Sequence, residues 1–389
     1  MNAGFSFSPV TLALGTTQTL AWASSYYLLA ILADPIAKDT GMSADAVFGA
    51  FSFALLISAS LGPRVGRTID RFGGRAVLVG SNLFFAAGLA GLAYSSSWPA
   101  VLLAWILIGV GMGLGLYDAA FATLGRIYGI AARSPITGIT LMAGFASTVS
   151  WPLTAWGLSS FGWRETCLAW ALAHLVIGIP LNASLPRKAE KGIADQATTK
   201  PRLPMDRNMW LLAVAFAAGW TISTAMAAHL PRLLQAAGAT ETQAITAGAL
   251  IGPAQVAARI IEASFLKRFH PLFSARLSSI MHPVGAALLC LGAGAVPMFA
   301  VLHGAGNGIL TIARGTVPLA LYGPVNYGYR LGVLGAPARV GQAGAPLLFA
   351  VLIDKFGAGA LVVSAALGLV TLAAFCLVTV LHQPEKTVA

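Results

Sequence analysis

The residues of this chain best suited to chemistry are ionisable side chains inside long apolar runs. Asp118 and Arg314 each lie well within such a run. A charge is costly in lipid, so each is expected to face protein or a water-filled space and to have a function. A carboxylate placed there binds a proton or pairs with a cation, whereas a guanidinium binds an anionic group. Both interpretations of Asp118, proton site and ion pair, are open from the sequence.

Histidines form a second set of candidates. His174, His282 and His303 all fall in apolar runs. Each has two interpretations, a proton shuttle working near neutral pH or a hydrogen-bonded packing residue. His303 stands at the start of its run, which argues against a central role.

Polar and aromatic side chains gather on one face of the first apolar run. Gln18, Trp22 and Tyr26 are spaced so that they share a helix face. Such a face is expected to line an internal cavity, although Trp and Tyr also form belts at membrane interfaces. Trp220 stands in mid-run and fits a belt poorly.

The elements that position these residues are membrane helices. The chain has 389 residues, of which 57% are hydrophobic and 10% charged, against about 25% charged residues in soluble domains. The runs lack the alternating pattern of a membrane barrel, so we expect an all-α protein. Twelve spans are predicted near 9–32, 44–64, 76–94, 99–125, 136–160, 165–185, 209–231, 241–262, 273–295, 298–322, 334–354 and 358–381.

Positive charge falls in alternate loops. Arg64, Arg67, Arg71 and Arg75 follow the second span, and further basic residues follow the fourth, sixth, eighth and tenth. Positive loops face the cytoplasm, which places both termini there. This assignment accounts for the net charge of +11 without a nucleic-acid partner.

The chain is predicted to contain two similar halves. Gly109–Gly113 and Phe161-Gly162 recur at one interval as Gly304–Gly308 and Phe356-Gly357. We expect an N-terminal six-helix bundle over 1–185, a cytoplasmic linker over 186–208 and a C-terminal six-helix bundle over 209–389, related as parallel repeats. The sequence shows no phosphate-binding glycine loop and no paired His-Glu metal motif, so no enzyme activity, cofactor or metal is predicted.

The segment Gly66–Arg75 carries the most specific motif. It reads glycine, three residues, then Asp-Arg-x-Gly-x-Arg, and we expect a short loop at the water interface. This pattern resembles the signature loop of the major facilitator superfamily. The resemblance implies a secondary transporter in a bacterial inner membrane, working as a monomer by alternating access. The substrate is expected to be a small organic molecule, anionic if Arg314 faces the cavity, with protons as the coupling ion.

The resemblance also selects the cavity residues, because spans one, four, seven and ten line the cavity in that fold. The candidates are Gln18, Trp22, Tyr26, Tyr117, Trp220, Asn307, Thr311 and Arg314. Arg314 is interpreted as the only basic residue deep within a span, either an anion site or part of a C-terminal ion pair.

A second set is expected to form a cytoplasmic latch, meaning contacts that hold the halves together on that side. In related transporters an acid on span four meets an arginine of the signature loop, which implies a pair between Asp118 and Arg75. Arg259 and Glu262 repeat Arg67 and Asp70 in the second half. The latch candidates are Gly66, Asp70, Arg71, Arg75, Asp118, Arg259 and Glu262.

Alternatives remain open at this stage. Span one is similar to a subgroup that includes arsenical exporters and monocarboxylate-like carriers, so efflux of a toxic solute is a second hypothesis. Drug–proton antiport is not supported, because Gly144–Pro152 lacks the adjacent Gly-Pro that marks many antiporters. A membrane receptor without transport is the remote alternative.

Overall fold

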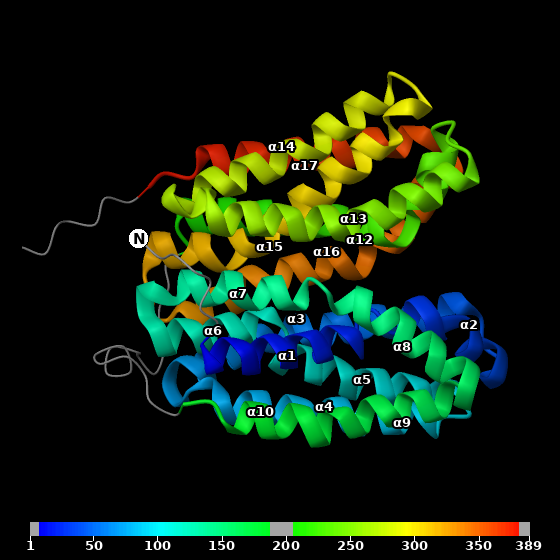
Figure 1. The fold of residues 1–389 in the computed structure, drawn as a ribbon, viewed down its shortest axis with the longest axis vertical. Coiled ribbons are helices and arrows are strands. Elements are labelled where there is room, and N and C mark those ends of the chain that lie inside the picture. Colours follow the sequence, from blue (N-terminus) through cyan, green and yellow to red (C-terminus); the bar gives the residue numbers. More distant parts are fainter. Residues whose placement is uncertain (1–7, 187–204, 381–389) are drawn as a thin grey trace, which may run out of the picture.

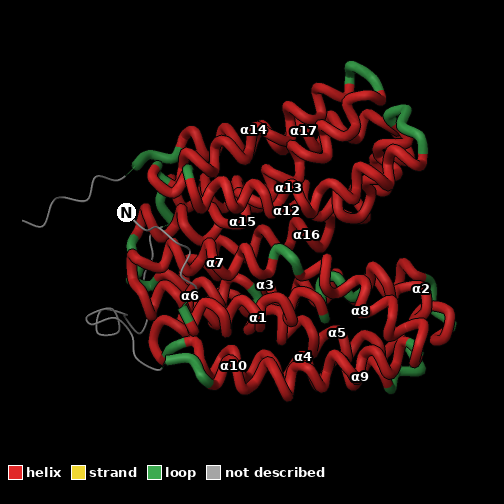
Figure 2. Tube along the Cα trace, in the orientation of Figure 1, coloured by secondary structure: helices red, strands yellow, loops and turns green. Residues whose placement is uncertain are grey.

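The computed structural model describes residues 8–186 and 205–380, which fold into helices joined by short turns (Figure 2). Each predicted apolar run coincides with one helix or with two successive helices. In the first half these are α1 (Pro9–Ala23), α2 (Leu29–Thr40), α3 (Ala44–Phe72), α4 (Gly74–Ala93), α5 (Trp98–Gly115), α6 (Tyr117–Tyr128), α7 (Arg133–Ala143), α8 (Ala146–Phe161), α9 (Trp163–Ala173) and α10 (Ile179–Ala183). The second half contains α12 (Arg207–Ala236), α13 (Glu241–Ser264), α14 (Pro271–Leu289), α15 (Val296–Tyr322), α16 (Tyr327–Phe356) and α17 (Ala360–Leu377).

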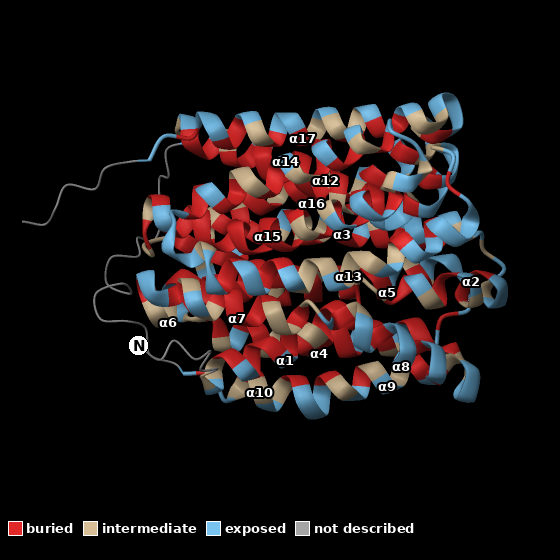
Figure 3. Ribbon diagram, turned by 45° about the horizontal axis from the view of Figure 1, so that its top comes forward, coloured by how far each residue is buried: buried red, intermediate tan, exposed pale blue. Residues whose placement is uncertain are grey.

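Long apolar helices dominate the chain. Within the described residues, nine stretches are long and apolar enough to cross a membrane, and three of them, Trp98–Phe161, Trp163–Ala183 and Tyr327–Leu377, cover more than one of these α-helices. Buried residues line the inside of the bundle, and the outer faces of the helices are exposed (Figure 3). Many exposed residues are large and apolar, such as Leu347 and Val362. Such a surface fits lipid as its solvent.

The helices lie in two groups, α1–α10 and α12–α17 (Figure 1). One buried apolar cluster belongs to the first group and takes in only Leu319, Tyr327 and Leu331 from the second. The other two clusters contain only residues beyond 208. Most of the predicted linker, 186–208, lies outside the described residues.

Three of the predicted spans are broken helices. The first is interrupted at residues 24–28, the fourth at Leu116, whose ψ of -174° is extended, and the fifth at Gly144 and Phe145. Breaks free backbone groups that need partners. Gln18 Nε2 donates to one of them, the Gly115 carbonyl, at 2.6 Å.

The predicted interface loop Gly66–Arg75 is mostly helical, which corrects the sequence interpretation. α3 continues to Phe72, and only Gly73 separates it from α4, with a φ of 90° that favours glycine. The charged residues of this segment are therefore carried on helix ends. We call this end of the molecule, which carries Arg67, Arg71, Arg75 and Arg126, the basic end.

Candidate functional site

A cavity between the two helix groups brings together residues far apart in the sequence. It encloses an empty volume of about 370 Å³, part of it open space. Five of the predicted cavity residues line it, one each from α1, the break after α1, α6, α12 and α15: Trp22, Tyr26, Tyr117, Trp220 and Arg314. Asp118, predicted for the latch, lies there as well. Leu55, Met112 and Leu116 add apolar walls.

Asp118 forms the centre of the cavity's charge cluster. Nε and Nη2 of Arg314 donate to its two carboxylate oxygens at 2.7 and 2.9 Å. Nη1 of Arg339 lies 2.7 Å from Oδ2. The predicted pair of Asp118 with Arg75 is therefore wrong in this structure, because both oxygens already have partners from the other helix group.

Arg339 is a site residue that the sequence interpretation missed. It is one of the basic residues expected in the loop after the tenth span, yet it lies inside α16 and is buried. Arg314 is consequently not the only basic residue deep in a helix, and Arg259 is buried too. The signal was present, because 339 falls within the predicted span 334–354.

The cluster carries one unbalanced positive charge. Guanidinium groups stay protonated in proteins, so the two arginines outnumber the single carboxylate. Of the described residues, these three are the charged ones that line the cavity. Arg339 contacts Asp118 through Nη1 as an ion pair, so only part of its five-donor guanidinium is engaged by the carboxylate.

Aromatic rings surround the charge cluster. The guanidinium carbon of Arg314 lies 5.5 Å from the Trp220 ring centroid, and the ring centroids of Trp22 and Tyr117 lie 5.0 Å apart. The indole N–H groups of Trp22 and Trp220 are buried and have no hydrogen-bond partner in the described part of the chain. Buried polar groups are normally paired, so these two donors and Arg339 fit the acceptor oxygens of a bound molecule.

The remaining candidates lie outside this cavity. Gln18 supports the break before α6, as described above. Asn307 accepts from Ser223 at 2.9 Å and lines a different cavity. The Thr311 hydroxyl donates to the Asn307 carbonyl at 2.9 Å. Gln342, which was not predicted, joins the cavity and donates to the Tyr26 hydroxyl at 3.4 Å.

Asp70 joins the two helix groups at the basic end. Its two carboxylate oxygens accept the backbone N–H groups of Gly328 and Tyr329, each at 2.8 Å. These are the second and third residues of α16, so the carboxylate caps the positive end of that helix. Gly66 makes the approach possible, because a Cβ there would lie 2.0 Å from the Gly328 carbonyl oxygen.

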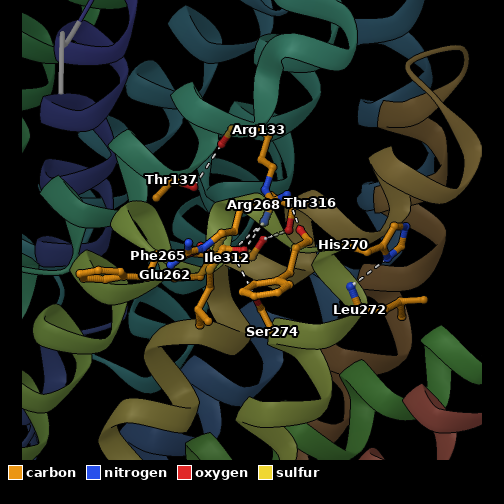
Figure 4. Close-up of polar contacts among 12 residues, drawn as sticks. Arg133, Thr137, Glu262, Phe265, Arg268, His270, Leu272, Ser274, Ile312 and Thr316 are labelled. Atoms are coloured by element: carbon orange, nitrogen blue, oxygen red, sulfur yellow. Dashed lines mark hydrogen bonds and ion pairs between the residues drawn. The ribbon is translucent and has the colours of Figure 1, made fainter. Parts of the chain in front are cut away.

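The second predicted acid, Glu262, makes an equivalent contact between α13 and α7 (Figure 4). Arg133 Nη2 donates to its Oε1 at 3.2 Å and the Ser274 hydroxyl donates at 3.3 Å. Arg133 also donates to the Phe269 carbonyl at 2.9 Å. Nearby, Arg259 donates to the Thr140 carbonyl at 2.8 Å. Asp70 and Glu262 thus each join the two helix groups.

The two other arginines of the latch set do not cross between the helix groups in the described structure. The Arg71 guanidinium lies over the ring of its neighbour Phe72, 4.9 Å from the centroid. Among the described residues, Arg75 has no hydrogen-bonding partner. Arg126 makes the local contact instead and donates to the Asp70 carbonyl.

The helix groups are in contact at the basic end and diverge towards the other (Figures 1 and 2). Gly62 and Gly66 of α3 pack directly against α16, whereas a Cβ at Gly49, near the start of α3, would meet nothing within 4 Å. The ion pairs at the opposite end, Arg164–Asp39 and Arg232–Asp354, each lie within one group. The structure is a conformation closed at the basic end.

Two groups of membrane helices around a polar cavity define a multi-pass membrane transporter. The family model of the Major Facilitator Superfamily matches residues 14–302, and the chain belongs to this superfamily.

Solved structures show the same fold at low sequence identity. The human organic anion transporter MFSD10 (TETRAN) is 16% identical with a TM-score of 0.75. The match covers 94% of this chain and 99% of the MFSD10 chain. The proton:xylose symporter XylE, solved with 6-bromo-6-deoxy-D-glucose, is 12% identical with a TM-score of 0.76, covering 95% of both chains. A comparison with curated proteins finds no match.

Proposed function

We propose that this transporter moves small organic anions by alternating access, coupled to protons. The observation that carries the proposal is the net positive cluster of Asp118, Arg314 and Arg339 inside the cavity. One unbalanced charge suits one carboxylate, which guanidinium and indole N–H groups would bind through hydrogen bonds. The surrounding rings suit an apolar, flat body. The proposed substrate is therefore a monocarboxylate with an apolar or aromatic body.

Alternating access follows from the placement of the cluster. Asp118 belongs to one helix group and both arginines to the other, so the cluster is formed only when the groups meet. A substrate carboxylate that takes over one arginine weakens the contact with Asp118. We propose that this exchange lets the two groups, 1–185 and 209–389, move as units about the linker 186–208.

The experiment is uptake of radiolabelled benzoate into proteoliposomes, with and without a pH gradient. Arg339→Lys keeps the charge but loses the planar fork, and Arg339→Ala loses both. We expect reduced uptake with the first variant and none with the second, while Arg232→Ala in the exposed pair at the other end transports normally. Because a variant can misfold, benzoate-induced thermal stabilisation is measured as well. Normal uptake by both Arg339 variants would contradict the proposal.

We further propose that the basic end faces the cytoplasm of a bacterial inner membrane and that a single chain transports. The arginine-rich helix ends support the orientation, and the cavity is complete within one chain. A cysteine placed beside Arg75 should then be unreactive towards a membrane-impermeant thiol reagent in intact cells. With this orientation the structure is outward-facing.

A further inference from the structure

A second cavity lies within α12, α14, α15 and α17. It has an empty volume of about 350 Å³ and shares no lining residue with the first cavity. Its walls are polar for the inside of a membrane protein, with Ser223, Ser278, His282, His303, Asn307 and Thr371. The sequence interpretation treated the two histidines as separate residues, and the structure brings them into contact.

The hydrogen bonds of this cavity are consistent with one continuous arrangement of protons. When the Ser364 hydroxyl donates to the Leu361 carbonyl at 2.9 Å, it accepts from His282 Nε2 at 3.0 Å. His282 Nδ1 is then an acceptor and receives the Nδ1 proton of His303 at 3.1 Å. This assignment leaves His303 Nε2 as an acceptor with no hydrogen-bonding partner among the described residues.

His174 in the other helix group shows the contrasting arrangement. Its Nδ1 contacts Asn82 Oδ1 at 2.8 Å and its Nε2 contacts the Ser24 hydroxyl at 2.7 Å. Both ring nitrogens have partners, and His174 lines neither of the two cavities. It is a packing histidine and provides a matched control.

Among the described residues, no carboxylate is bonded to the pair. In the second helix group Glu262 pairs with Arg133, Asp354 pairs with Arg232, Asp206 accepts from the Tyr322 hydroxyl, and Glu241 is exposed. Four charged or titratable side chains on the neighbouring helices have their own contacts: Arg276 with the Phe375 carbonyl, Arg259 with Gly308 and Thr140, Arg314 with Asp118, and His229 with the Pro346 carbonyl. Arg207 and Cys376 are exposed. A proton on the pair would add a positive charge with no local counter-ion.

We propose that the His282–His303 pair is a proton-binding site, loaded at His303 Nε2 from water in the second cavity. The proton forms an imidazolium whose Nδ1–H still donates to His282, and it returns to water on release. This inference rests on the proposed proton-coupled transport and assigns the coupling site. It places proton and substrate in different cavities.

The helices that separate the two cavities supply the coupling. On α12, Ser223 lines the second cavity and Trp220 the first. On α15, Asn307 lines the second cavity and Arg314 lines the first. A buried charge without a partner is unfavourable, so the protonated pair favours a conformation in which the second cavity is hydrated. A ligand that prefers one conformation shifts the population towards it.

The transport test separates proton coupling from substrate binding. Benzoate counterflow between equal pH values needs no proton gradient, whereas accumulation needs one. We expect His303→Gln to retain counterflow and lose gradient-driven accumulation, and His174→Gln to retain both. Accumulation by His303→Gln at the wild-type level overturns the inference. Absence of counterflow in the wild type contradicts the proposed function instead.

A direct test does not depend on the substrate. Protein labelled with ¹⁵N-histidine is reconstituted in liposomes and titrated from neutral pH to the pH at which it unfolds. We expect an imidazolium signal that disappears in His303→Gln, while the His174 signal stays neutral. An imidazolium that persists in His303→Gln, or two neutral rings throughout the titration, overturns the inference.

Discussion

At the scale of single residues, the central feature is a carboxylate shared by two guanidinium groups. Asp118 and its partners are all buried. Removing one member of a buried ion pair typically costs about 3–5 kcal/mol, because the remaining charge is left without compensation. The cluster is therefore sensitive to substitution and to any anion that can replace Asp118.

Asp118→Asn tests this directly. It leaves two buried guanidinium groups beside a neutral amide, and we expect a loss of about 3–5 kcal/mol in apparent stability. Benzoate should restore more of this loss in the variant than it adds to the wild type. Thermal unfolding followed by tryptophan fluorescence measures both effects.

The control for this prediction is Asp354→Asn. Asp354 pairs with Arg232 at an exposed site, where ion pairs contribute about 0–1 kcal/mol. An equal loss of stability in the two variants would show that burial of the Asp118 cluster has no special effect.

At the scale of helices, the crossing of α3 and α16 depends on the absence of side chains. Gly66 faces Gly328, and Gly62 faces Gly332. A Cβ at Gly62 would lie 3.1 Å from the carbonyl oxygen of Gly332. Small residues allow backbones to approach closely. The contact lies at the basic end, so we expect a change in it to affect whether that end is closed or open.

Gly66→Ala is expected to open the basic end. The added methyl group would meet backbone at 2.0 Å, and overpacking of this kind costs about 1–3 kcal/mol in the closed conformation. Each 1.4 kcal/mol changes a population ratio about tenfold. Distances between spin labels at the basic ends of α3 and α16 report the shift.

Gly49→Ala is the matched control on the same helix. A Cβ there meets nothing within 4 Å, so the distance distribution should equal that of the wild type. If Gly66→Ala also leaves the distribution unchanged, the close crossing does not govern closure.

The helices were predictable from sequence, and the contacts between them largely were not. Long apolar runs are a strong signal, so every predicted span is helical. The break at Leu116 is invisible because both sides of it are apolar. Gly66–Phe72 was interpreted as a loop because it is charged, although charged residues also suit a helix end. Helix ends and breaks depend on backbone contacts that hydropathy does not record.

The candidate site shows the same division. Trp22, Tyr117, Trp220 and Arg314 were identifiable because the family resemblance names the spans that line the cavity, and for Arg314 also because a charge within a span rarely faces lipid. Their partners were not, since pairing depends on which helices meet. The partner of Asp70 is a pair of backbone N–H groups, which leaves no mark in the sequence.

At the scale of the whole molecule, two acids connect the helix groups at different places of the basic end. Asp70 of the first helix group caps α16 in the second, and Glu262 of the second group pairs with Arg133 in the first. Their positions correspond in the two halves of the chain. We propose that closure is shared between these two separate contacts, each of which crosses between the groups.

Asp70→Asn and Glu262→Gln should each favour opening at the basic end. An amide in place of Asp70 turns one acceptor into a donor that faces a backbone N–H, and hydrogen bonds to charged groups contribute about 1.5–3 kcal/mol. Because the two acids share no partner, their effects on the closed-to-open free energy should add to within about 0.3–0.5 kcal/mol. Spin-label distances across the basic end in the two single variants and the double variant measure this sum.

Arg71→Ala provides the control for this cycle, since the Arg71 guanidinium lies over the ring of its neighbour Phe72 and forms no ion pair with the described residues. It should leave the distance distribution unchanged despite lying beside Asp70. A double variant no more open than either single variant would mean that one contact already releases the whole end. Closure would then be a single event at one acid, and the symmetric arrangement would have no mechanical consequence.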